Sequence, residues 1–161
     1  MKLEVRAAIP SDIPILMQLE RLDGYDILVG RWDADQHAKE ITAASNRYFV
    51  GSEGDEIVAF SILQNVGSSN RCIRIRRIIA KTPGRGDGSR FLQSSLAICF
   101  DELGAHRVEL LVHLRNERAR RVYARAGFVE EGTLRDLHRN DDGSFVSMRI
   151  MSLLQPDWAA S

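Results

Sequence analysis

The sequence has little of what marks several classes of protein. It holds two cysteines, Cys72 and Cys99, which are too few for a disulfide framework, and no Cys/His cluster indicates a metal site. No window approaches the roughly 20 apolar residues that cross a bilayer, and the N-terminal segment lacks the apolar core of a signal peptide. We therefore expect a cytoplasmic, reduced protein with no metal and no membrane contact.

An excess of charge of one sign is missing as well. Lys and Arg number 22 and are balanced by 22 Asp and Glu, so the formal net charge is zero. A dedicated nucleic-acid binder normally carries a basic excess, and we expect no nucleic-acid partner. Repeats, linkers and low-complexity runs are also absent, which predicts one domain over residues 1–161.

Hydrophobic periodicity predicts an α/β fold with a mixed sheet. Apolar stripes at helical spacing favour a helix after Pro10, with Ile13, Ile15, Leu16 and Leu19 inward, and another with Leu92, Leu96, Phe100 and Leu103 inward. Strands are predicted at 3–8, 48–51, 57–64, 71–81, 108–114, 128–137 and 145–153, and helices also at 35–44, 88–103 and 116–126.

The strand at 71–81 carries an irregularity. Ile73 and Ile75 share one face, but Arg77 breaks the alternation and Ile78 continues out of phase. A break of one residue is typical of a β-bulge, because strand side chains alternate with a period of two.

A glycine-rich turn, Pro83-Gly-Arg-Gly-Asp-Gly-Ser-Arg, separates this strand from the next helix. Glycines allow close backbone approach, and the first amides of a helix are unpaired and electropositive, so the turn is suited to a pyrophosphate. A plain strand-to-helix connection explains the glycines equally well. The P-loop lysine is missing, and serine stands where a dinucleotide fingerprint needs its last glycine, so both of those motifs fail.

A second motif follows the strand at 108–114. It runs from Asn116, a good N-cap, through Ala119 and Tyr123 to Gly127 and Phe128, with its apolar residues on one helical face. Its arginines, Arg118, Arg121 and Arg125, are typical of a solvated face.

Together the two motifs resemble those of the GCN5-related N-acetyltransferase (GNAT) superfamily, over 3–154. Gly86 and Gly88 match the first signature, in which Pro83 replaces the usual Gln or Arg, and the second signature matches at every fixed position. The segment after Gly127 is similar to the branch with ribosomal-protein N-terminal acetyltransferases and related amine-modifying enzymes. The resemblance implies a mostly antiparallel sheet of about seven strands with flanking helices and a V-shaped splay between the fourth and fifth strands.

The resemblance also implies a mechanism with acetyl-CoA as cosubstrate. Backbone amides of Arg77 and Ile78 would hold the pantetheine and polarise the thioester, Asn116 would contact the pantetheine arm, and Tyr123 would protonate the departing thiolate. A free amine would attack directly. The pyrophosphate would lie on the turn residues Gly84, Arg85, Gly86, Asp87, Gly88 and Ser89.

The general base is left open by the sequence. Arg74 and Arg76 occupy the fourth strand, where relatives often carry glutamate, and on the fifth strand Glu109 and His113 share a face with Leu111. His113 titrates in the useful range, although a structural or exposed histidine is the more common case, and a water chain to bulk solvent is a further alternative.

The acceptor amine is open too, between a polypeptide N-terminus and a small molecule such as a polyamine, an amino acid analogue or an aminoglycoside. We expect the 23–32 loop and the 138–142 turn to wall its site. A non-catalytic acyl-CoA-binding module is a third hypothesis, and the apolar run at 145–154 permits a homodimer. Acids that could attract a cationic amine are Asp23, Asp26, Asp33, Asp141 and Asp142.

Overall fold

The central sheet is mixed and mostly antiparallel. The computed structural model describes residues 2–25 and 30–161. Within these residues, seven strands form one sheet in the order β1-β2-β3-β4-β5-β7-β6. Neighbours are antiparallel except β4 and β5, which are parallel. The strands are β1 (Glu4–Ala7), β2 (Arg47–Glu53), β3 (Glu56–Gln64), β4 (Cys72–Ala80), β5 (Arg107–His113), β6 (Val129–Arg139) and β7 (Phe145–Leu154).

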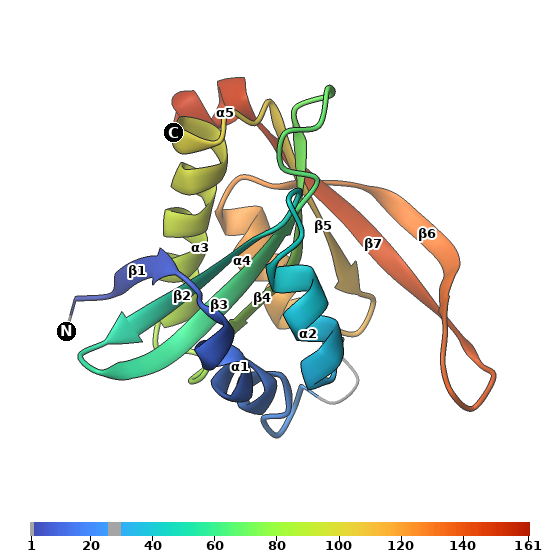
Figure 1. The fold of residues 1–161 in the computed structure, drawn as a ribbon. Coiled ribbons are helices and arrows are strands. Elements are labelled where there is room, and N and C mark those ends of the chain that lie inside the picture. Colours follow the sequence, from blue (N-terminus) through green and yellow to red (C-terminus); the bar gives the residue numbers. More distant parts are fainter. Residues whose placement is uncertain (1, 26–29) are drawn as a thin grey trace.

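Helices cover both faces of this sheet (Figure 1). The short η1 (Pro10–Asp12), α1 (Ile13–Glu20) and α2 (Ala34–Ile41) lie on one face. The other face carries α3 (Asp87–Ala97), its π-helical continuation η2 (Ile98–Glu102) and α4 (Glu117–Arg125). The predicted order of elements is confirmed, with one helix missed, α5 (Gln155–Ala159), whose Trp158 ring stacks on Phe100 at 5.6 Å.

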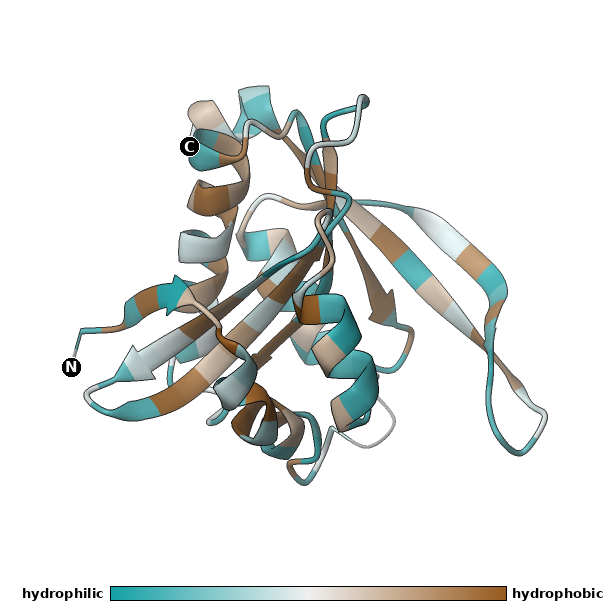
Figure 2. Ribbon diagram, viewed as in Figure 1, coloured by the Kyte–Doolittle hydropathy of each residue, from teal (hydrophilic) through white to brown (hydrophobic). Residues whose placement is uncertain are grey.

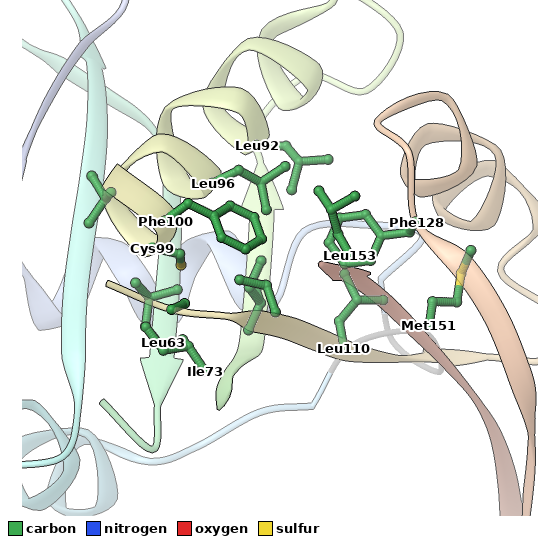
Figure 3. Close-up of a cluster of buried hydrophobic side chains, with 14 of the residues drawn as sticks. Leu63, Ile73, Leu92, Leu96, Cys99, Phe100, Leu110, Phe128, Met151 and Leu153 are labelled. Atoms are coloured by element: carbon green, nitrogen blue, oxygen red, sulfur yellow. The ribbon is translucent and has the colours of Figure 1, made fainter. Parts of the chain in front are cut away.

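The face that carries α3 holds the larger hydrophobic core. Leu92, Leu96 and Phe100 point from the helix onto the sheet, as their spacing predicts, and Phe128 joins them from the end of the α4 segment (Figure 3). The smaller core lies under α1 and contains Leu16 and Leu19.

Ile15 was predicted to lie on the inner stripe of the first helix, and that prediction is wrong: its side chain is 38% exposed. The reason is that α1 turns only a narrow face to the sheet, so Leu16 and Leu19 fill the core beneath it while Ile15 lies at the helix's outer edge.

Hydropathy follows the layers: β5 is strongly apolar, whereas α2 is largely hydrophilic (Figure 2).

The predicted bulge in β4 is confirmed, and it exchanges the two faces of the strand. Leu63 pairs with Ile75, whereas the adjacent residue of β3, Ile62, pairs with Arg77. Arg76 is therefore the extra residue of the bulge. Ile75 belongs to the core under α3, whereas Ile79 belongs to the core under α1. Because a bulge shifts the alternation by one residue, both halves of β4 can bury their odd-numbered side chains on different faces.

The splay between β4 and β5 is confirmed as well. Their pairing runs from Cys72 with Arg107 to Ile75 with Leu110 and goes no further among the described residues. Beyond that point β4 continues to Ala80 and β5 to His113, and the two strands diverge (Figure 1). An open strand edge thus faces the gap.

No helix of the described segments has the length and apolar character to cross a membrane.

Candidate active site

The exposed backbone of β4 faces into the splay in a defined alternation. The Lys81 amide donates to the Val58 carbonyl of β3 at 2.7 Å, so the Ala80 carbonyl, on the opposite side of the same peptide, faces β5. Hydrogen-bonding groups alternate between the two edges of a strand. We therefore assign the Ile78 amide to the splay and the Arg77 amide to the ladder with β3. Of the two predicted amide donors, Ile78 is the better placed.

Tyr25 marks the same edge and was not singled out from the sequence. Its hydroxyl donates to the Ala80 carbonyl at 2.8 Å, which places the ring at the opening of the splay. Burial raises the pKa of Tyr25. Burial, and then the charge of Tyr25, raise the pKa of Tyr123, so the two phenols lie within electrostatic range of each other. Only a contact between residues 55 positions apart reveals Tyr25, and no local pattern carries that signal.

The glycine turn ends in a helix N-terminus, as predicted. Gly84 and Gly86 have φ of 89° and 88°, and Gly86 is the N-cap of α3. The first backbone bond of the helix runs from the Arg90 amide to the Gly86 carbonyl at 3.0 Å, so the amides before Arg90 have no partner within the helix. A Cβ on either glycine would meet nothing within 4 Å. The cradle is therefore open, and its donors fit an anionic group.

Individual residues of the turn differ in what they offer. Arg85 and Pro83 are exposed, whereas Asp87 is buried and its carboxylate accepts a hydrogen bond from Arg90. Asp87 can thus contribute its backbone amide, while its negative charge is neutralised. Gly88 and Ser89 lie in the first turn of α3.

The second motif forms α4 and turns Tyr123 toward the core side. The Asn116 side-chain oxygen accepts from the Ala119 amide at 3.2 Å, which caps the helix and leaves the side-chain NH₂ as the group available to a ligand. Tyr123 packs against Phe128 with ring centroids 5.8 Å apart. Burial raises the pKa of Tyr123, so its hydroxyl stays protonated at neutral pH. Within residues 2–25 and 30–161, that hydroxyl has no hydrogen-bond partner, which leaves its proton free to be donated outward.

The two candidate bases of β5 are both engaged. Glu109 accepts from Arg74 at 2.6 Å and from Arg107 at 3.0 Å, and although burial opposes the effect, these bonds lower its pKa. His113 accepts the Arg115 amide on Nδ1 at 3.1 Å. Burial, and then the charge of Arg115, lower the pKa of His113. The ring is therefore neutral at pH 7, but its lone pair is occupied until that contact opens.

A buried ionic cluster supports the other side of the splay, and sequence reasoning missed it. The Arg77 guanidinium donates to the Glu20 carboxylate at 2.7 Å and lies 4.2 Å from the ring centroid of Trp32. His37 Nε2 is 2.9 Å from the same carboxylate, without full hydrogen-bond alignment, and its Nδ1 is 3.1 Å from the Tyr48 hydroxyl. Arg77, Glu20 and His37 are all buried. This cluster holds Trp32 and the end of α1 against the bulge.

Two of the acids expected to attract a cationic amine have local roles. Asp33 caps α2 by accepting the Gln36 amide at 2.8 Å, and Asp142 accepts from the amide and hydroxyl of Ser144. Asp26 lies outside the described residues.

Cysteine and metal chemistry find no support in the described chain. Burial raises the pKa of Cys99 to about 12 and also raises that of Cys72, which disfavours a nucleophilic thiolate at either position. No group of His, Cys, Asp and Glu side chains in the described ranges could hold a metal ion.

Comparison with solved structures shows where this fold occurs. A spermidine N-acetyltransferase SpeG chimera from Vibrio cholerae and hSSAT matches with a TM-score of 0.87 and 23% identity, covering 100% of both chains. The dodecameric spermidine N-acetyltransferase from Vibrio cholerae matches with a TM-score of 0.79 and 24% identity, covering 97% of this chain and 95% of that one. At these identities the likeness shows a common fold.

Sequence comparison adds the family. The "Putative ribosomal N-acetyltransferase YdaF" of Bacillus subtilis (strain 168) is 35% identical over 98 residues, which are 60% of this chain and 52% of the relative. The match thus spans about half the length of that curated relative. The model of the acetyltransferase (GNAT) family matches residues 15–128, a range that includes the bulged strand, the glycine turn and the Asn116-to-Phe128 motif. The chain belongs to the acetyltransferase (GNAT) family.

Proposed function

We propose that this protein transfers the acetyl group of acetyl-CoA to a primary amine by direct attack. The proposal is supported by the open β4 edge beside the unpaired N-terminus of α3, together with the Tyr123 phenol, which lies within electrostatic range of Tyr25 at the Ala80 carbonyl. Acetyl-CoA supplies the activated acyl group as a thioester. The protein's own groups bind it, polarise it and provide a proton.

The predicted cofactor-binding residues other than Arg77, whose amide faces β3, each have a role that their positions permit. The amides of the 84–89 turn and the α3 N-terminus bind the pyrophosphate, with Arg85 exposed beside them. The Asn116 NH₂ group holds the pantetheine arm. The Ile78 amide donates to the thioester oxygen, a contact worth a few kcal/mol when charge develops there. Tyr123 donates its proton to the departing sulfur.

Proton removal from the acceptor ammonium is assigned to solvent water or to His113. His113 is neutral at pH 7, as a base must be, but it first has to release the Arg115 amide. Glu109 is held by two arginines, so its low basicity makes it the poorer candidate.

Two acceptor classes have separate support. Similarity to YdaF, whose name assigns it to ribosomal acetylation, favours a polypeptide N-terminus. The solved spermidine N-acetyltransferases share the fold along the whole chain and favour a small-molecule amine. A non-catalytic acyl-CoA-binding role is the remaining alternative.

Thiol release from acetyl-CoA, measured across a panel of small amines and peptides, tests the proposal. We expect release that depends on the acceptor, and mass spectrometry should find the acetyl group on nitrogen. Tight acetyl-CoA binding with no release for any acceptor would identify a binding module instead.

A further inference from the structure

Two adjacent arginines at the bulge, Arg76 and Arg77, differ in whether their charge is paired. Arg77 is buried and neutralised by Glu20 at 2.7 Å. Arg76 is only partly buried, and it forms no ion pair or hydrogen bond with any residue of the ranges 2–25 and 30–161. Its guanidinium lies 5.7 Å from the ring centroid of Trp32. A planar, always charged group with an aromatic wall and five free donors is suited to a carboxylate.

Basic side chains lie near Arg76, although Arg74 is itself paired with Glu109, and no acid of residues 2–25 and 30–161 forms an ion pair with Arg76. Burial lowers the pKa of Arg76, and the nearby charge of Arg74 lowers it further. Burial and the charge of Arg76 likewise lower the pKa of His138 on β6. The charge of Glu40 opposes the lowering of the Arg76 pKa, but its carboxylate accepts from Asn46 at 2.6 Å and from Gln36 at 2.8 Å and forms no ion pair with Arg76 among the described residues.

The position of Arg76 separates it from the cofactor phosphates. Arg76 lies at the point where β4 and β5 part, whereas the glycine turn follows the far end of β4 at Ala80. At about 3.3 Å per residue, four residues of strand place Arg76 roughly 13 Å from that end. A pyrophosphate bound at the turn leaves Arg76 on the side where the acetyl group meets its acceptor.

We infer that Arg76, backed by Trp32, binds a carboxylate carried by the acceptor, so that the preferred substrate is an amine with a negative charge rather than a polycation. This inference rests on the proposed acetyl transfer and names its substrate class. Bidentate guanidinium–carboxylate contacts give both affinity and orientation, so they would hold the amine at a fixed distance from the thioester. The carboxylate could belong to a small amino acid or to a residue near a peptide N-terminus.

Acceptors of equal length and different charge test the inference. The small-molecule arm compares β-alanine, its amide and 1,3-diaminopropane, and the peptide arm compares Ala-Asp-Gly-amide with Ala-Asn-Gly-amide. Because a hydrogen bond to a charged group is worth enough to change affinity about ten- to a hundredfold, we expect kcat/KM for the carboxylate to exceed that for its amide by at least about tenfold in one arm. The arm that shows the preference identifies the source of the carboxylate.

Arg76→Gln should remove that preference, lowering kcat/KM about ten- to a hundredfold for the acid and less than about threefold for the amide. Arg76→Lys should retain part of it. Lys39→Gln, an equal charge change on an exposed residue of α2, is the matched control and should leave the preference intact. The acetyl-CoA Kd should change less than about twofold in all three variants.

Three results would overturn the inference: the diamine as the best acceptor of the wild type, an equal loss for acid and amide in Arg76→Gln, or a large rise in its acetyl-CoA Kd. If no acceptor supports thiol release, the proposed function fails instead. Calorimetric titration of β-alanine and the Asp peptide into the CoA complex then still tests the subsite, and equal binding by wild type and Arg76→Gln would contradict it.

Discussion

The two sides of the β4–β5 splay differ in the groups that form them, backbone on one side and side chains on the other. The cofactor side, as we propose it, consists of backbone: a strand edge, a glycine turn and two helix caps, each formed by residues adjacent in sequence. The proposed acceptor side consists of side chains brought together from distant positions, such as Glu20, Trp32 and Arg77. A cosubstrate shared by a whole family can be held by the first kind of surface. Selectivity for one amine requires the second, because only side chains provide charge and shape that differ between relatives.

The largest effect should come from the chemistry of the cofactor side. Tyr123→Phe removes the proton donor, so kcat should fall at least about 100-fold while the acetyl-CoA Kd stays within about twofold. Steady-state thiol release and calorimetric titration measure the two quantities. Tyr48→Phe removes a buried hydroxyl that lies on the other face of the sheet, and it should change kcat less than about threefold. An equal rate in Tyr123→Phe and wild type would end the general-acid assignment.

On the acceptor side the largest effect should be on stability. Glu20→Gln leaves the buried Arg77 guanidinium uncompensated, which typically costs about 3–5 kcal/mol of unfolding free energy. Urea denaturation followed by circular dichroism measures it. As a control, Glu56→Gln breaks an ion pair whose carboxylate side chain is 60% exposed, and only a small change is expected. Similar losses of unfolding free energy in both variants would show that the buried Glu20 cluster stabilises the protein no more than an exposed ion pair does.

A smaller effect on stability should show whether a glycine of the turn is required for its backbone conformation or only for the room that it leaves. Gly86→Ala places a side chain at φ of 88° and should lower the unfolding free energy by about 1–2 kcal/mol. Gly88→Ala lies within α3, where a Cβ would meet the Ala80 Cβ at an ordinary 3.5 Å, so stability should be equal or higher. Thermal denaturation compares them. The reverse order of stabilities would contradict the αL cap that this structure gives to α3.

The smallest effect concerns the unassigned base. The pKa of His113 is lowered, so its base form predominates at neutral pH, and any loss of rate from its protonation begins only as pH falls below its ordinary value of about 6.5. His113→Gln should change kcat/KM less than about threefold at pH 7.5, with the rate following the acceptor's own amine pKa. A pH–rate profile decides: an acidic limb lost only in His113→Gln would instead make this histidine the base.

The same contrast explains what the sequence could predict. Local periodicity predicts a bulge at Arg77, one residue after the extra residue Arg76, and capping predicts the helix that begins after Asn116 and contains Tyr123. The structure contains both features. The V-shaped splay was implied by family resemblance and not by the residues alone. Local patterns thus describe the backbone surfaces of the splay well.

Long-range side-chain contacts escaped the same reasoning. Glu20 and Arg77 are 57 positions apart, and in a sequence each reads as one more exposed charge. Tyr25 lies in a loop without periodicity, and Ile15 matched a helical stripe wider than the face that α1 actually buries. Such features depend on how elements pack, and packing is not encoded in the spacing of neighbours.

A crystal structure of the protein with CoA tests the central claim most directly. We predict the pantetheine along the β4 edge next to Ile78, the pyrophosphate on the amides of the 84–89 turn, and the Tyr123 hydroxyl about 3 Å from the sulfur. Tyr25 should release the Ala80 carbonyl or border the pantetheine. CoA bound away from the splay, or a sulfur beyond hydrogen-bond reach of Tyr123, would contradict the account.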